Sequence, residues 1–300
     1  MKKPISTIFK LLKITFKKWW ARNPFVQSQV VGYNAIFSLP GLMVVVLAIA
    51  SYFGGADALN GKMHVQIAQA LGTETANQIQ GMVMFASKSK DSTVATIIGI
   101  GIILIGATGV FVQFQRSLNA IWEVKASKTK SGILSYLKTR IFSFGLIVSI
   151  AFLLLISLVI SSLLSAFSSW VLMHWSESLL ILFQIINVVL SLSIIAVLFA
   201  LMFIFLPDVK IKWRTVWIGA FVTSLLFVLG KTALGLYFGK ASPGSGYGAA
   251  GSIILILLWT SYSSMIVFFG AEFTKVYSDH HYGKLPASEN GVKVKEQKCK

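Results

Sequence analysis

The chain has 300 residues, of which 55% are hydrophobic and only 12% are charged. A soluble domain carries about 25% charged residues, and half that share does not cover a water-facing surface of this size. The 22 phenylalanines and 8 tryptophans exclude intrinsic disorder, and the single cysteine excludes a disulfide scaffold. The composition therefore predicts a protein that crosses a membrane several times.

Residues 1–28 are predicted to form a cytoplasmic amphipathic interfacial helix. Apolar residues recur at helical spacing over positions 5–19, with lysines between them. A basic helix of this kind lies in the membrane interface, and Trp19 and Trp20 are its expected anchors. An RNA-binding face is the alternative reading of the same lysines. Asn23 then precedes a proline, which ends the helix before the first span.

Five stretches without charged residues, and a sixth apolar stretch that Lys231 interrupts, locate six predicted spans within the membrane domain 29–275. A helix needs about 20 apolar residues to cross the bilayer core. The stretches are continuously apolar, unlike the alternating strands of a barrel, and lipid requires each span to satisfy its own backbone hydrogen bonds. The predicted fold is therefore all-α, a polytopic helix bundle with spans near residues 29–53, 93–115, 141–166, 179–206, 214–238 and 251–275.

Basic residues alternate in number from one connecting segment to the next. One alternating set, which includes residues 1–28 and the tail, holds 22 of the 27 lysines and arginines. Basic residues flank the cytoplasmic side of a membrane, so both termini are predicted to be cytoplasmic. The net charge of +17 follows from this topology and from attraction to anionic lipid head groups, which are the expected partners, so no nucleic-acid partner is needed. The basic tail 276–300 is predicted to be disordered.

The loop 54–92 is too long for a simple turn and is predicted to form a small extracytoplasmic helical cap. Val65, Ala68 and Leu71 share one helical face, and Gly72 is a stop signal before a second helix. Packing on the bundle is the expected role of this cap, and a substrate gate is the alternative.

Two ionisable residues fall inside predicted spans, where such groups are costly and point to function. Lys231 in the fifth span is predicted to face Asn187 or Gln184 of the fourth. In that position it would contact an anion or phosphate in a cavity. Alternatively, its long stem reaches the outer head groups, which requires no function.

The second ionisable residue is Glu272, near the inner end of the sixth span. A buried pair with Arg116, at the same level at the end of the second span, is one expectation, and a surface pair with Lys275 one helical turn on is another. A proton or substrate site and simple exposure are the further alternatives.

Uncharged polar residues are candidates on the same grounds. Asn34 and Ser38 lie one helical turn apart, just before Pro40, which kinks the first span. Tyr262 lies within a serine cluster in the sixth span. Such groups line a cavity or bond a neighbouring helix, and the second outcome is the commoner.

Four segments together resemble the YihY/virulence factor BrkB family of bacterial inner-membrane proteins. They are Tyr33-Asn-Ala-Ile-Phe-Ser-Leu-Pro40, Arg116-Ser-Leu-Asn-Ala-Ile-Trp122, Leu206-Pro-Asp-Val-Lys210, and the stretch from Tyr247-Gly-Ala-Ala-Gly to Gly270-Ala-Glu-Phe273. The resemblance covers roughly residues 20–280 and implies an integral inner-membrane protein of uncharacterised activity. The family's older name, ribonuclease BN, is generally regarded as misassigned and brings no catalytic residues.

The expected function is therefore non-enzymatic, in transport or in a lipid- or envelope-related role. A membrane-bound hydrolase is the alternative, but metal-assisted hydrolysis needs clustered carboxylates or histidines. His64 and His174 are predicted outside, and His280 and His281 inside, so the four do not form one site. No catalytic, cofactor-binding or metal-binding residue is predicted. An oligomeric channel is the third hypothesis, and the sequence is compatible with a homo-oligomer.

Overall fold

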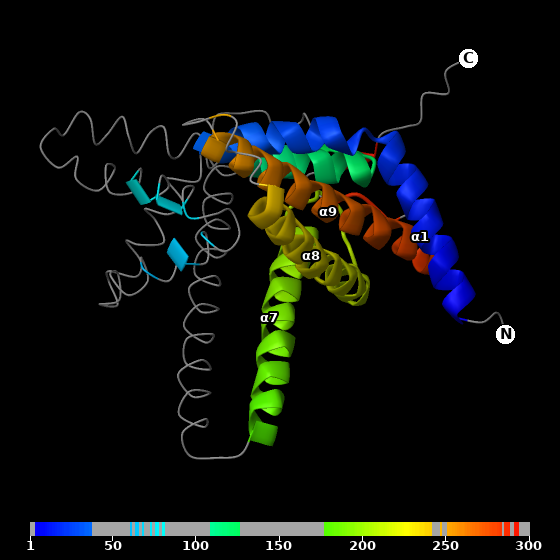
Figure 1. The fold of residues 1–300 in the computed structure, drawn as a ribbon. Helices are drawn as coiled ribbons and strands as arrows, with labels where there is room; N and C mark the ends of the chain where they lie inside the picture. The colour runs from blue at the N-terminus through cyan, green and yellow to red at the C-terminus, as the bar shows by residue number, and fades with distance from the viewer. Residues whose placement is uncertain are drawn as a thin grey trace, which may run out of the picture.

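The computed structural model describes residues 4–37, 109–126, 177–241, 247, 251–283, 285–288 and 291–293, with isolated positions between 61 and 81. Its elements in chain order are α1 (Pro4–Ala21), a helix over 24–37, a helix over 109–121, β1 (Val124–Ala126), α7 (Glu177–Phe205), α8 (Trp213–Ala241), α9 (Gly251–Tyr282) and β2 (Gly291–Lys293) (Figure 1). The described chain is mostly helical, as predicted. The two short strands are additions that the all-α prediction did not contain.

Three helices among the described residues are long and apolar enough to cross a membrane. Their apolar stretches are Val188–Phe205, Trp213–Phe238 and Ile253–Tyr282, which correspond to the fourth, fifth and sixth predicted spans. The first two predicted spans are described only in part, by the helices over 24–37 and 109–121. The third predicted span lies outside the described residues. The count of six spans, and the outer cap, therefore stay predictions.

The helix α1 packs against α9, and the two run in opposite directions. Leu11 joins Phe273 in one buried cluster, and Trp19, two turns further along α1, packs edge-on against Phe269. Figure 1 shows α1 beside the C-terminal part of α9. The indole Nε1 of Trp19 donates to the backbone oxygen of Met265 at 3.2 Å. The indole N–H of Trp19 is therefore bonded within the protein, while its ring is half-buried and Trp20 is exposed. The role of the two residues as lipid anchors stays a prediction.

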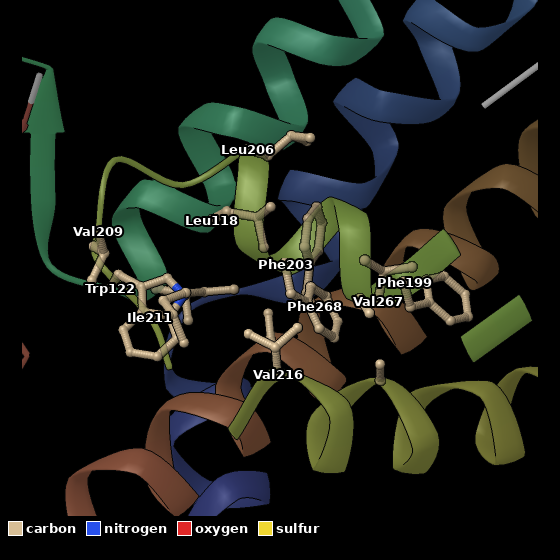
Figure 2. Close-up of a cluster of buried hydrophobic side chains, with 14 of the residues drawn as sticks. Leu118, Trp122, Phe199, Phe203, Leu206, Val209, Ile211, Val216, Val267 and Phe268 are labelled. Atoms are coloured by element: carbon tan, nitrogen blue, oxygen red, sulfur yellow. The ribbon is translucent and has the colours of Figure 1, made fainter. Parts of the chain in front are cut away.

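A large cluster of buried apolar side chains lies among the described residues where five helices meet. It joins the helix over 24–37, the C-terminal end of the helix over 109–121, the end of α7, the connection to α8, the first turns of α8, and α9. Figure 2 shows these side chains pointing toward one another, among them Leu118, Trp122, Phe203, Leu206, Val209, Val216 and Phe268. Two of the segments that carry the family resemblance, around Leu118 and Leu206, therefore supply core residues.

Two glycine–threonine pairs bring α8 and α9 close together. Thr274 of α9 packs on Gly219 of α8, and Thr223 of α8 packs on Gly270 of α9. Each threonine hydroxyl donates to the carbonyl of the glycine four residues earlier in its own helix, at 2.6 Å for Thr223 and 2.7 Å for Thr274. Small residues at a helix interface allow such close backbone approach, and each glycine here leaves the space that the opposite threonine fills.

Candidate functional site

The site is built around Arg22, which lies at the corner between α1 and the helix over 24–37. Asn23 follows with φ of 50°, a left-handed conformation that asparagine tolerates better than most residues. Pro24 then begins the next helix, where its fixed φ suits the first turn and its missing N–H is no loss. The sequence Arg-Asn-Pro thus makes a sharp corner with the arginine on it.

The guanidinium of Arg22 holds the C-terminal end of the helix over 109–121. Its Nη1 donates to the backbone oxygen of Ala120 at 2.7 Å, and its Nη2 to that of Ile121 at 3.3 Å. The last carbonyls of a helix have no partner within the helix, and a basic side chain satisfies them while also opposing the helix dipole. Arg22 therefore joins two segments that lie about a hundred residues apart in the chain.

The same guanidinium pairs with two carboxylates. Arg22 Nε donates to Glu272 Oε2 at 3.0 Å, and Arg22 Nη2 lies 3.2 Å from Glu123 Oε1. Lys275 Nζ also bonds Glu123 Oε1. We call Arg22, Glu123, Glu272 and Lys275 the Arg22 cluster. It contains two positive and two negative side chains, and this balance offsets much of the cost of removing them from water.

Glu272 is the most deeply buried member of the Arg22 cluster. Its side chain is 1% exposed, and residues 270–276 of α9 are all buried. Within the described part of the chain, its Oε1 has no hydrogen-bond partner. A buried carboxylate with one oxygen unpaired is costly unless its other contacts are strong, and the bond to Arg22 supplies such a contact.

The backbone is also unusual at the Arg22 cluster. Among the described non-glycine residues, the two with positive φ are Asn23 (50°), next to Arg22, and Glu123 (57°), which is a member of the cluster. Such conformations cost about 1–3 kcal/mol each and persist only where the surrounding contacts enforce them. The ion pairs and carbonyl bonds of Arg22 are the contacts that fix both corners here.

The predicted pair between Glu272 and Arg116 is wrong. Arg116 is exposed on the helix over 109–121, and the carboxylate is bound by Arg22 instead. Lys275 is buried, but its described ion pair is with Glu123 and not with Glu272. Sequence reasoning counted Arg22 only toward the basic excess of the N-terminal segment. The signal that could have singled it out is its position directly before the Asn-Pro break.

Asn119 and Asp208 form a second polar contact beside the Arg22 cluster. Asn119 Nδ2 donates to Asp208 Oδ2 at 2.8 Å, and the Asp208 backbone N–H donates to Asn119 Oδ1 at 2.8 Å. Burial raises the pKa of Asp208, and the bond from Asn119 lowers it by a smaller amount. The two residues belong to two different segments of the family resemblance, which the structure therefore brings into direct contact.

The segment after α9 is hydrogen-bonded to the residues around Asp208. Ser288 N–H donates to the Asp208 carbonyl at 2.9 Å, and Ala287 forms an antiparallel bridge with Val209. Further on, β2 pairs antiparallel with β1, so that Val124 lies opposite Lys293. The prediction that 276–300 is disordered is therefore wrong for the described residues of this range, since α9 continues to Tyr282 and β2 follows.

The other candidate residues lie at separate helix contacts. Asn34 Nδ2 donates to the Val30 carbonyl of its own helix at 2.8 Å, and its Oδ1 lies over the backbone of Gly109. Tyr262 of α9 packs on Gly230 of α8. Within the part of the chain that the structure describes, neither residue belongs to the Arg22 cluster.

Lys231 is exposed on α8, one residue after the glycine that Tyr262 covers. The side chains of Asn187 and Gln184 lie outside the described residues, as does Ser38. The predicted contact of Lys231 with the fourth span therefore stays a prediction.

The comparison with protein families decides the identity of the chain. Residues 15–293 match the family model described as virulence factor BrkB. The chain belongs to the BrkB family. The match begins inside α1 and ends at the last residue of β2, so the Arg22 cluster, the Asn119–Asp208 contact and the strand pair all lie within it. The resemblance read from the sequence is thereby confirmed.

The BrkB family chain is also similar to proteins named UPF0761 membrane protein in several bacteria. The relative from Verminephrobacter eiseniae is 26% identical over 246 residues, which cover 81% of this chain and 56% of the relative. The one from Teredinibacter turnerae is 26% identical over 258 residues, 83% of this chain and 56% of the relative. The one from Tolumonas auensis is 24% identical over 260 residues, which cover 85% of this chain and 81% of the relative.

This BrkB family chain thus spans little more than half the length of the first two relatives. The names of these relatives describe membrane proteins and state no activity. No solved structure matches the chain. Family membership and the three apolar helices therefore establish a membrane protein of uncharacterised function.

Proposed function

We propose that this chain is a non-enzymatic integral protein of the bacterial cytoplasmic membrane that transports, or otherwise handles, a lipid or another envelope component. The observation that carries the proposal is Glu272, which is buried on α9 and pairs with Arg22, because α9 is long and apolar enough to span the membrane. Ionisable residues in such helices mark pathways and binding sites more often than they mark stability. Replacing a buried pair by apolar residues is often neutral for stability, so stability alone does not account for it.

We further propose that both termini lie in the cytoplasm. Four segments are predicted to be cytoplasmic from their basic residues: 1–28, the second connection, the fourth connection and the tail. The described parts of all four are joined by hydrogen bonds, through Arg22 to Ala120, Asn119 to Asp208, and Asp208 to Ser288. Segments on opposite sides of a bilayer do not meet in this way, so these contacts support one common side.

Cysteine accessibility tests this topology. The natural Cys299 reports on the tail, and Lys128→Cys in a Cys299→Ser background reports on the second connection. Both are expected to react with a membrane-impermeant maleimide only in inside-out vesicles. The control is Lys62→Cys in the outer loop, which is expected to react only in intact cells treated from outside. Labelling of positions 128 and 299 from opposite sides would overturn the proposal.

Reconstitution tests the function. The protein is incorporated into liposomes, and the movement of fluorescent phospholipids and of small ions is followed beside protein-free liposomes. Lipid or ion movement that Glu272→Gln abolishes and Arg116→Gln leaves unchanged is the expected result. A parallel incubation with RNA, with and without a chelator, tests the hydrolase alternative. RNA cleavage that follows the purified protein and is lost on chelation would overturn the non-enzymatic proposal.

A further inference from the structure

The helix α1 presents two different faces. Leu11 and Thr15 are buried, and Trp19 is bonded to α9, so this face belongs to the protein core. The opposite side carries Phe9, Phe16 and Trp20, all exposed, with Phe9 reaching 74%. The amphipathic pattern seen in the sequence therefore contains two apolar surfaces, and only one of them is used to hold α1 in place.

The exposed aromatic residues lie beside a row of lysines. Positions 9, 13, 16 and 20 fall on one side of a helix with 3.6 residues per turn, and positions 10 and 17 lie next to them. Lys10, Lys13 and Lys17 are all exposed, and α1 contains no aspartate or glutamate. We call Phe9, Phe16, Trp20 and these three lysines the α1 outer stripe.

The exposed surface changes in character at the Asn23 corner. Trp20 at the end of the α1 outer stripe contacts Phe25 across the corner, with ring centroids 5.6 Å apart. Beyond the corner, the exposed side of the helix over 24–37 carries apolar and aromatic residues at helical spacing, Val26, Val30, Tyr33 and Phe37, with the uncharged Gln29 beside them. Residues 24–37 contain no charged residue. A basic aromatic surface therefore continues directly into an uncharged one.

We propose that the α1 outer stripe binds the anionic head groups of phospholipids and that the hydrocarbon of the bilayer begins at the Asn23 corner. Aromatic rings favour the boundary between head groups and acyl chains, and neighbouring lysines are attracted to anionic lipid. Lysine stems lie along apolar surface while their ammonium groups reach the phosphates. This inference deepens the proposed membrane function by naming a lipid class and the residues that contact it.

The chemistry of the surface favours lipid over RNA. Aromatic platforms with basic residues also bind single-stranded nucleic acid. Such platforms, however, do not continue into a helix face made of valine, tyrosine and phenylalanine. A bilayer would cover the exposed apolar residues that follow Asn23. The packing of α1 against the apolar helix α9 also places α1 beside a helix suited to the membrane.

Lipid preference is tested in nanodiscs with Ile8→Cys in the Cys299→Ser background, labelled with a fluorophore. Quenching by spin-labelled phosphatidylglycerol is compared with quenching by spin-labelled phosphatidylcholine. We expect preferential quenching by the anionic lipid, reduced roughly a hundredfold in association constant by a Lys10→Gln, Lys13→Gln, Lys17→Gln triple variant. A matched triple variant at Lys125, Lys210 and Lys293, which are exposed elsewhere, is expected to keep the preference.

Replacing the same three α1 lysines by arginine preserves charge and is expected to preserve the preference. This variant separates the role of charge from any effect on folding. Equal quenching by the two lipids in the unsubstituted background, or an equal loss in the matched control, would overturn the proposal. A fluorescence change on adding RNA that competes with the anionic lipid would identify a nucleic-acid face instead.

The position of the hydrocarbon boundary is tested separately by spin labels at residues 9 and 30. The spin label at residue 30 is expected to be more accessible to oxygen than to a water-soluble nickel reagent. The label at residue 9 is expected to be more accessible to the nickel reagent than to oxygen. The same order at both positions would overturn the boundary at Asn23. Both measurements are made at equilibrium and do not require transport. Failure of the lipid-binding inference is therefore distinguishable from failure of the proposed transport function.

Discussion

Arg22 and Glu272 are separated by 250 positions in the chain, yet Arg22 Nε donates to Glu272 Oε2 at 3.0 Å. This bond joins the corner after α1 to the middle of the buried part of α9. Because the same guanidinium binds Glu123 and two helix-terminal carbonyls, Arg22 connects the N-terminal segment, the helix over 109–121 and the C-terminal helix.

Arg22→Gln is expected to be strongly destabilising. It removes the partner of a carboxylate that is 1% exposed, and losing one member of a buried pair costs about 3–5 kcal/mol. Thermal unfolding in detergent measures the effect. Arg116→Gln is the control and should change stability by no more than about 0.5 kcal/mol, as exposed substitutions usually do. A larger loss for Arg116→Gln than for Arg22→Gln would contradict the assignment of the pair.

Stability is expected to depend on the ionisation of Asp208. Burial raises its pKa, so between the ordinary value and the raised value the native protein binds more protons than the unfolded chain. The contribution of this group is fully present below the ordinary pKa and is lost as pH rises through the raised one. The unfolding temperature, measured from about pH 4 to 7, should therefore fall with rising pH in part because of Asp208, and Asp208→Asn should remove that part of the fall.

Asn119→Ala tests the same contact from the side of its partner. It leaves the Asp208 carboxylate and backbone N–H without their partner, which costs about 1–3 kcal/mol. Asp208→Asn keeps an acceptor for Asn119 Nδ2 and should cost less. If Asp208→Asn destabilised the protein more than Asn119→Ala at neutral pH, the charge of Asp208 would be favourable and the sign of the predicted slope would be wrong.

Alanine at either glycine of the α8–α9 contact is expected to be destabilising. A β-carbon at Gly219 would overlap Thr274, and one at Gly270 would overlap Thr223, and both threonines are fully buried. Overpacking of this kind costs about 1–3 kcal/mol. Gly81→Ala is the matched control, because Gly81 is helical with open space around it and alanine there should stabilise by about 0.5–1 kcal/mol.

A double substitution checks the cause of that loss. Thr274→Ala removes the atoms that a β-carbon at Gly219 would meet. The Gly219→Ala, Thr274→Ala pair should therefore cost less than the sum of the two single substitutions. Strict additivity would show that the two residues do not share the contact.

Removing residues 284–300 is expected to loosen the contact between Asn119 and Asp208. The truncation deletes β2, the Ala287 bridge to Val209 and the Ser288 bond to Asp208. A loss of about 2 kcal/mol from these backbone bonds would lower the unfolding temperature by roughly 4–8 °C. Removing only residues 295–300 keeps the described contacts and serves as the control. Identical unfolding temperatures for the two truncations would mean that β2 adds no stability.

The sequence by itself determined that this protein belongs in a membrane, and it located three of its long helices. Apolar stretches long enough to cross a bilayer are local properties, so the helices α7, α8 and α9 could be located from composition alone. The break at Asn23 and the basic amphipathic character of α1 are local for the same reason.

Only the tertiary structure decided which polar groups meet. Arg22, Glu123 and Glu272 come from segments whose relative placement depends on how the helices pack, and no spacing in the chain carries that information. Arg116 and Arg22 carry the same charge and both belong to segments predicted to be cytoplasmic, but Arg116 is exposed and Arg22 pairs with the buried carboxylate. The same reason explains the tail. Short strands have little stability of their own, so β2 forms only because β1 is positioned to pair with it.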